Sequence, residues 1–124
     1  MIKFIFYTDK LLKSWQSGCS FGPVVIIRPS CKNDKGLLVH ELTHVSQFWK
    51  CFPIFGYRYK ISRRYRRDYE VEAYARQALC YDDDKVPCFA KYISENYDLG
   101  LSKEVAESLI RAKKNEILRE TSSS

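Results

Sequence analysis

The chain of 124 residues contains only two histidines, and both lie in the pentapeptide HELTH at positions 40–44. The segment around this pentapeptide predicts a helix over residues 36–50, because apolar residues recur there at helical spacing and extend to most of its faces. A helix that is apolar on most sides belongs in the core, so the polar groups on it need partners. On such a helix, His40 and His44 lie one above the other on the same face. The main apolar stripe consists of Leu38, Leu42, Val45 and Trp49.

Two imidazoles in this arrangement can bind a single Zn²⁺ ion. Glu41 is rotated by about 100° from His40, so its carboxylate lies beside the ion rather than on it. That position suits a general base acting on metal-bound water. The alternative is two structural histidines on a core helix with a solvated Glu41, and it leaves two imidazoles and a carboxylate in need of other buried partners.

A catalytic zinc site needs a third protein ligand, and the chain has no third histidine. The ligand must then be Asp, Glu or Cys. The best candidates are Glu70 and Glu72, on a second helix predicted over residues 62–79. Because they are two residues apart on a helix, their side chains are separated by about 200° of rotation around the helix axis, so only one of them can face the metal. Periodicity does not choose between them, and the other is expected to neutralise nearby arginines.

Two segments resemble the gluzincin-type metallopeptidases. Residues 36–47 (GLLVHELTHVSQ) resemble the active-site helix of that group, and most closely the small metallopeptidase-like domains found with phages and bacterial contractile injection systems. Residues 67–74 (RDYEVEAY) resemble the gluzincin E-x-x-A motif, in which the Glu three residues before the Ala binds zinc. The resemblance spans about residues 22–79 and implies that Glu70 is the third ligand. Tyr74 stands where many relatives carry Asp or Asn.

This resemblance implies a zinc-dependent metallopeptidase that hydrolyses peptide bonds in a peptide or protein substrate. Zn²⁺ would be held by His40, His44 and Glu70, with Glu41 as the general base. A further group usually stabilises the oxyanion, and an arginine or one of several tyrosines can serve. The candidate tyrosines are Tyr57, Tyr59, Tyr65, Tyr69 and Tyr74.

The remaining patterns predict an α+β fold over residues 1–124, a single minimal zincin-like domain. A small β-sheet packs on the helix that carries the histidines and on the Glu-bearing helix, with further helices at the C-terminal end. Strands are expected over 2–8 and 24–28, with residues 9–21 left irregular. If the strand over 24–28 forms a sheet edge, it can pair with an extended substrate.

Turn and capping residues bound the helices. Asn33 or Asp34 is expected to cap the helix that carries the histidines. C-terminal helices are expected from Pro87 to about 95 and from Ser102 to about 119. The last of these has a predicted apolar stripe, and residues 121–124 should fray. The stripe consists of Val105, Leu109, Ala112 and Ile117.

The net charge of +6 is concentrated in residues 57–67, which hold six cations and no acid. The plainest interpretation is a solvated, arginine-rich start of a helix. If the segment borders the active site, it would favour acidic side chains around the scissile bond. With its interleaved tyrosines, it also permits a nucleic-acid-associated protease or nucleic-acid binder.

Another class of function is a non-catalytic module of a phage or injection-system particle that is stabilised by zinc. The chain has no apolar run long enough to span a membrane and no secretion signal, so a cytoplasmic or particle-associated protein is expected. Its five cysteines are expected to be mostly reduced, semi-buried thiols, since no secretion signal accompanies them.

Overall fold

The computed structural model describes residues 1–123, which form an α+β fold as the sequence predicted. Its strands and helices follow one another along the chain with short connections. They are β1 (Phe4–Tyr7), β2 (Gly18–Phe21), β3 (Val24–Ile27), the 3₁₀ helix η1 (Pro29–Cys31), α1 (Lys35–Lys50), α2 (Phe55–Ile61), α3 (Arg63–Ala78), α4 (Val86–Asn96) and α5 (Lys103–Ser122).

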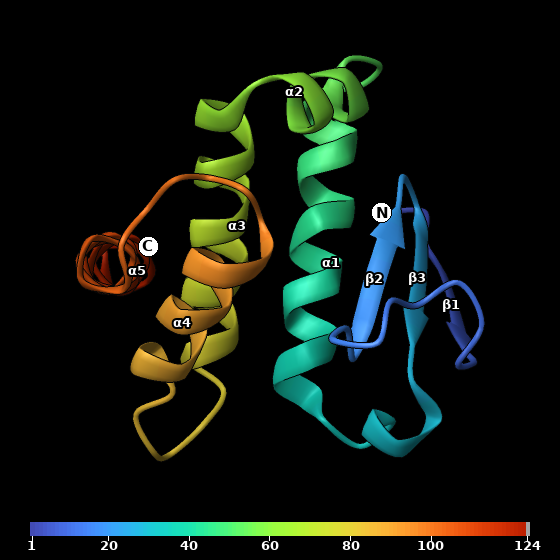
Figure 1. The fold of residues 1–124 in the computed structure, drawn as a ribbon, viewed down its shortest axis with the longest axis horizontal. Helices are drawn as coiled ribbons and strands as arrows, with labels where there is room; N and C mark the ends of the chain where they lie inside the picture. The colour runs from blue at the N-terminus through green and yellow to red at the C-terminus, as the bar shows by residue number, and fades with distance from the viewer. Residues whose placement is uncertain (124) are drawn as a thin grey trace.

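The elements stack in layers, with α1 between the sheet and α3 (Figure 1). On the other side of α3 lie α4 and α5, and α2 bridges the end of α1 and the start of α3. The helix that carries both histidines is therefore the central layer, as its apolar character predicted. None of the helices within residues 1–123 is long and apolar enough to cross a membrane.

The sheet has the strand order β1-β3-β2, with β3 parallel to β1 and antiparallel to β2. The condition for substrate pairing at 24–28 is not met, because β3 is hydrogen-bonded on both sides and is not a sheet edge. The edge strand beside α1 is β2, which the sequence did not predict because its residues, GCSF, carry almost no strand pattern. The strand expected over 2–8 is present but shorter, because β1 covers only Phe4–Tyr7.

Local sequence signals place the helix starts well. The side chain of Asp34 accepts a hydrogen bond from the backbone N–H of Leu37, which makes Asp34 the N-cap of α1. Ser62 and Ser102 cap α3 and α5 in the same way. The predicted helices agree with α1, α3 and α4 to within one residue at each end, but the short helix α2 was not predicted.

Two apolar clusters hold the layers together. One joins the inner face of the sheet to α1, through Val25, Ile27, Leu37 and Val45. The other fills the space between α3, α4 and α5, and the predicted apolar side of α3 lies in it, as expected. That side consists of Val71, Tyr74, Ala75 and Ala78.

The predicted stripe of α5 is wrong in half of its members. Val105 is 48% exposed and Ala112 is also exposed, whereas Ala106 and Ile110 are fully buried. Both stripes have helical spacing, and packing against α4 selects the second one. The fraying predicted for 121–124 is wrong for the first two residues, because α5 continues to Ser122; residue 124 lies outside the described residues.

Candidate metal centre

The three predicted ligands converge from two helices. His40 and His44 project from α1, and Glu70 projects from the facing side of α3. Nε2 of His40 lies 3.4 Å from Oε1 of Glu70, and Nε2 of His44 lies 3.1 Å from Oε2. One ligand atom from each residue lies within 4.8 Å of the other two, and all three side chains are buried. Two imidazoles and a carboxylate are a common ligand set for catalytic zinc.

The charges at this centre are strongly coupled in the metal-free state. Burial alone would lower the pKa of His44, but the Glu70 carboxylate raises it to about 9. Burial alone would raise the pKa of Glu70, but the two imidazoles hold it well below its usual range. Oε1 of Glu70 is buried and accepts no hydrogen bond. An ionised, incompletely satisfied carboxylate between two imidazoles fits a divalent cation.

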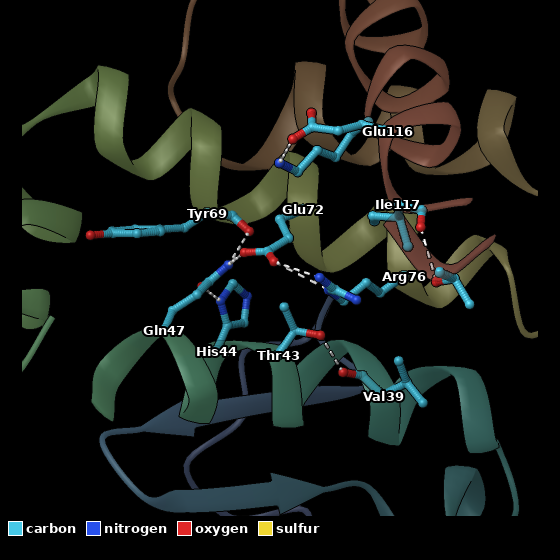
Figure 2. A network of polar contacts seen from close by, with 11 residues as sticks. Val39, Thr43, His44, Gln47, Tyr69, Glu72, Arg76, Glu116 and Ile117 are labelled. Atoms are coloured by element: carbon cyan, nitrogen blue, oxygen red, sulfur yellow. Dashed lines mark hydrogen bonds and ion pairs between the residues drawn. The ribbon is translucent and has the colours of Figure 1, made fainter. Parts of the chain in front are cut away.

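A hydrogen-bond network behind His44 fixes its ring (Figure 2). The Nε2 amide of Gln47 donates to the backbone oxygen of Tyr69 at 3.0 Å and to Oε1 of Glu72 at 2.9 Å. Oε1 of Gln47 must then accept from Nδ1 of His44, which lies 2.8 Å away. This leaves Nε2 of neutral His44 free to bind a metal, as supporting hydrogen bonds do in zinc proteins.

The two candidate glutamates thus occupy different places. Glu70 lies between the imidazoles, whereas Glu72 contacts Gln47 and pairs with Arg76 at 3.1 Å. Neutralising an arginine is the role that the sequence predicted for the glutamate outside the centre. The added contact with Gln47 was not predicted, because the sequence marks Gln47 only as the last residue of the segment that resembles the gluzincin helix.

Glu41 lies between the metal centre and the edge strand β2. Its burial raises its pKa, while a hydrogen bond from Ser20 on β2 favours the ionised form. Gly18 on the same strand lies beside it, because a Cβ there would be in ordinary contact with Oε2 of Glu41, 3.4 Å away. A carboxyl with a raised pKa beside a metal centre suits a group that accepts and returns a proton.

Of the five candidate tyrosines, two lie at the centre. The hydroxyl of Tyr59 donates to Oε2 of Glu70 at 2.5 Å. The ring of Tyr74 packs against His40, with 4.3 Å between ring centroids, and its hydroxyl contacts that of Tyr97 at 2.7 Å. Tyr57 and Tyr65 are exposed, and the hydroxyl of Tyr69 donates to Cys51. The sequence did not single out Tyr97, which follows α4 far along the chain.

A cleft runs along β2 past the metal centre. Its part next to the ligands is a cavity of about 450 Å³, which His40, His44, Glu41 and Glu70 help to line. A second cavity of about 240 Å³ continues from His40 toward Leu37 at the start of α1. The two cavities share Trp15 and Tyr97, whose rings meet edge to face with centroids 5.5 Å apart. The centre is therefore reachable from solvent between β2 and the C-terminal half of the chain.

The arginine-rich stretch lies next to this cleft, but of its six cations, all described by the structure, only Arg66 lines the larger cavity. Arg63 pairs with Asp98, Arg67 pairs with Asp68, and Arg58 lies over the ring of Tyr65. Of residues 57–67, all of which the structure describes, Tyr59 and Arg66 line the larger cavity. Nucleic-acid binding by this stretch stays a prediction.

All five cysteines carry free thiols, and Cys80 and Cys88 are exposed, so these two are not semi-buried as expected. Cys19 is buried on β2, and its burial together with nearby Glu41 raises its pKa to about 11, which keeps the thiol protonated.

Comparisons of the chain with models of protein families, with curated proteins and with solved structures found no match.

Proposed function

We propose that the protein is a zinc-dependent metallopeptidase. The observation that carries the proposal is the convergence of His40, His44 and Glu70 in a solvent-reachable cleft, with the carboxyl of Glu41 beside them. Three protein ligands leave one position of a tetrahedral zinc ion open, which is the arrangement of catalytic rather than structural sites. When bound there, zinc would acidify water and polarise the substrate carbonyl.

The chain's own residues supply the proton transfer. Glu41 accepts a proton as water attacks the peptide carbonyl and then delivers it to the leaving amine. Burial raises the pKa of Glu41, while the neighbouring Ser20 side chain favours the ionised carboxylate. Tyr59 and Gln47 hold Glu70 and His44 in place, so the ligands need little rearrangement on metal binding.

The edge strand gives the substrate a place to bind. Because β2 pairs with β3 on one side only, its other side can accept an extended peptide by backbone hydrogen bonds. Gly18 and Ser20 on β2 lie next to Glu41, so a peptide paired with this strand passes the general base.

The test compares the zinc-loaded parent with Glu41→Gln on an unfolded, fluorescently labelled protein substrate. We expect both to hold one zinc per chain, and the variant to cleave at least a hundredfold more slowly than the parent. Glu95→Gln, an exposed charge change on α4, is the matched control and should cleave like the parent. Equal cleavage by Glu41→Gln would contradict the mechanism.

A second candidate is a zinc-stabilised module without catalytic activity. The near-complete burial of the ligands, with Glu70 1% exposed, favours it, since structural ions are enclosed by protein. The same experiment separates the two proposals. Unfolding on chelation, with no cleavage of any substrate by the zinc-loaded parent, would favour the structural role.

A further inference from the structure

We propose that Arg66 binds a carboxylate of the substrate, namely an Asp or Glu side chain on the amino side of the cleaved bond. The inference rests on the proposed function and names the substrate class that the cleft selects. Arg66 lies four residues before Glu70, so the two lie one turn apart on the same side of α3. Both line the larger cavity together with His44.

The guanidinium of Arg66 lacks the partners that other arginines of the chain have. Its Nε is buried and makes no hydrogen bond, and its Nη1 reaches only the backbone oxygen of Lys60, at the limiting distance of 3.5 Å. By contrast, Arg28, Arg63 and Arg67 each pair with an aspartate. A buried donor without a partner is unfavourable, and a carboxylate of the substrate would satisfy it in two-pronged geometry.

The other charges around the cavity are compatible with an acidic group. Glu70 belongs to the candidate metal centre, where a bound cation would offset its charge, and Glu41 lies beside it. Asp98 lies at the rim with an 86% exposed side chain and faces Arg63 at 3.8 Å. Lys13 adds a second cation to the lining. Among the described residues that line this cavity, the cations are Lys13 and Arg66, and Arg66 is the less exposed of the two, with its Nε enclosed by protein.

The direction of the strands sets which side of the scissile bond Arg66 meets. In Figure 1, β2 and α1 run the same way, and α3 begins beside the end of α1. Arg66, in the first turn of α3, thus lies toward the C-terminal end of α1, while the smaller cavity lies toward its start. A peptide that pairs antiparallel to β2 has its amino side at Arg66. Antiparallel pairing is the more stable arrangement per residue.

The test measures binding rather than cleavage, by fluorescence anisotropy on the zinc-loaded Glu41→Gln protein. Labelled peptides of one sequence carry Glu or Gln on the amino side of the central bond, and each is made with a free or an amidated C-terminus. We expect the Glu peptides to bind about ten- to a hundredfold more tightly than the Gln peptides, which is the range for a charge-assisted hydrogen-bonded pair. Amidation of the C-terminus should change little.

Two variants assign the preference to this side chain. Arg66→Gln should bind Glu and Gln peptides with equal affinity. Arg66→Lys keeps the positive charge but cannot donate two parallel hydrogen bonds to a carboxylate, so it should retain only part of the preference. Arg64→Gln, an exposed change on the same helix, is the matched control and should keep the full preference. One zinc per chain in each variant shows that the metal centre is intact.

The proposal is overturned by no difference between Glu and Gln peptides, by a preference that survives in Arg66→Gln, or by no peptide binding at all. A preference that follows the free C-terminus instead identifies the terminal carboxylate as the ligand and overturns the side-chain assignment. Hydrolysis by the parent without any acidic preference contradicts this inference alone. Acid-selective binding without hydrolysis contradicts the proposed function alone.

Discussion

In the metal-free protein, we expect the free energy of unfolding to fall as the pH rises from 6 to 8.5, and we expect Glu70 to be the cause. Protonated His44 lies 3.1 Å from the buried Glu70 carboxylate, which raises its pKa to about 9 from the ordinary 6.5. A group whose pKa is higher in the folded state than in the unfolded state stabilises the fold fully at a pH below its unfolded-state pKa. That stabilisation is lost as the pH rises through the folded value.

The size of the effect follows from the shift. The difference between these two pKa values corresponds to about 3 kcal/mol, of which about 2 kcal/mol is lost between pH 6 and 8.5. Small proteins have total stabilities of about 5–15 kcal/mol, so the loss is readily measured. At acidic pH the lowered pKa of Glu70 gives the opposite pH dependence. The ionised Glu70 carboxylate stabilises the fold, and this stabilisation is lost as the pH falls and the carboxylate becomes protonated.

The assay is urea unfolding with a chelator at several pH values, in a Glu41→Gln background. That background is needed because burial raises the pKa of Glu41 as well, and its carboxyl would destabilise the fold in the same direction as the pH rises. Adding Glu70→Gln removes the charge that holds the proton on His44, so the decline above pH 6 should disappear. An equal decline with Gln at position 70 would refute the reasoning.

Zinc should reverse the sign of the pH dependence. His44 must lose its proton to bind a metal, so zinc binding by the apoprotein releases protons at pH 7 and becomes tighter toward pH 9. The zinc-saturated protein should accordingly gain stability over the range in which the metal-free protein loses it. Zinc titrations in weakly buffered solution with a pH indicator measure the released protons directly.

Three further predictions concern the metal ligands and the fit of the fold. Glu70→Ala should abolish stoichiometric zinc binding, whereas Glu72→Ala, which removes only supporting hydrogen bonds, should keep one zinc per chain at an affinity about 10–100-fold lower by competitive chelator titration. Gly36→Ala should destabilise the protein by about 2 kcal/mol in urea unfolding, because its Cβ would press into the ring of Tyr81. A Cβ at Gly56 on helix α2 would have no atom within 4 Å, so Gly56→Ala should instead stabilise the protein by about 0.5–1 kcal/mol. Equal zinc affinities in the first pair, or equal stabilities in the second, would contradict these assignments.

Helix boundaries were predictable wherever the signal was local. Asp34 and Ser62 start helices because their side chains satisfy free backbone N–H groups one turn ahead, and this depends on neighbouring residues alone. The edge strand β2 had no such signal. It is a strand because β3 offers it hydrogen-bond partners, and its glycine and serine face Glu41 rather than an apolar core.

The sequence by itself determined that two imidazoles share one face of a buried helix, and it favoured two glutamates as candidates for a third ligand. Helical spacing fixes these relations within one element, whatever the rest of the chain does. Only the tertiary structure decided that Glu70 meets the imidazoles while Glu72 supports Gln47, because this depends on how α3 is rotated against α1. It likewise brought Tyr59 and Arg66 to the cleft, since periodicity reports which face of a helix is buried but not what that face will meet.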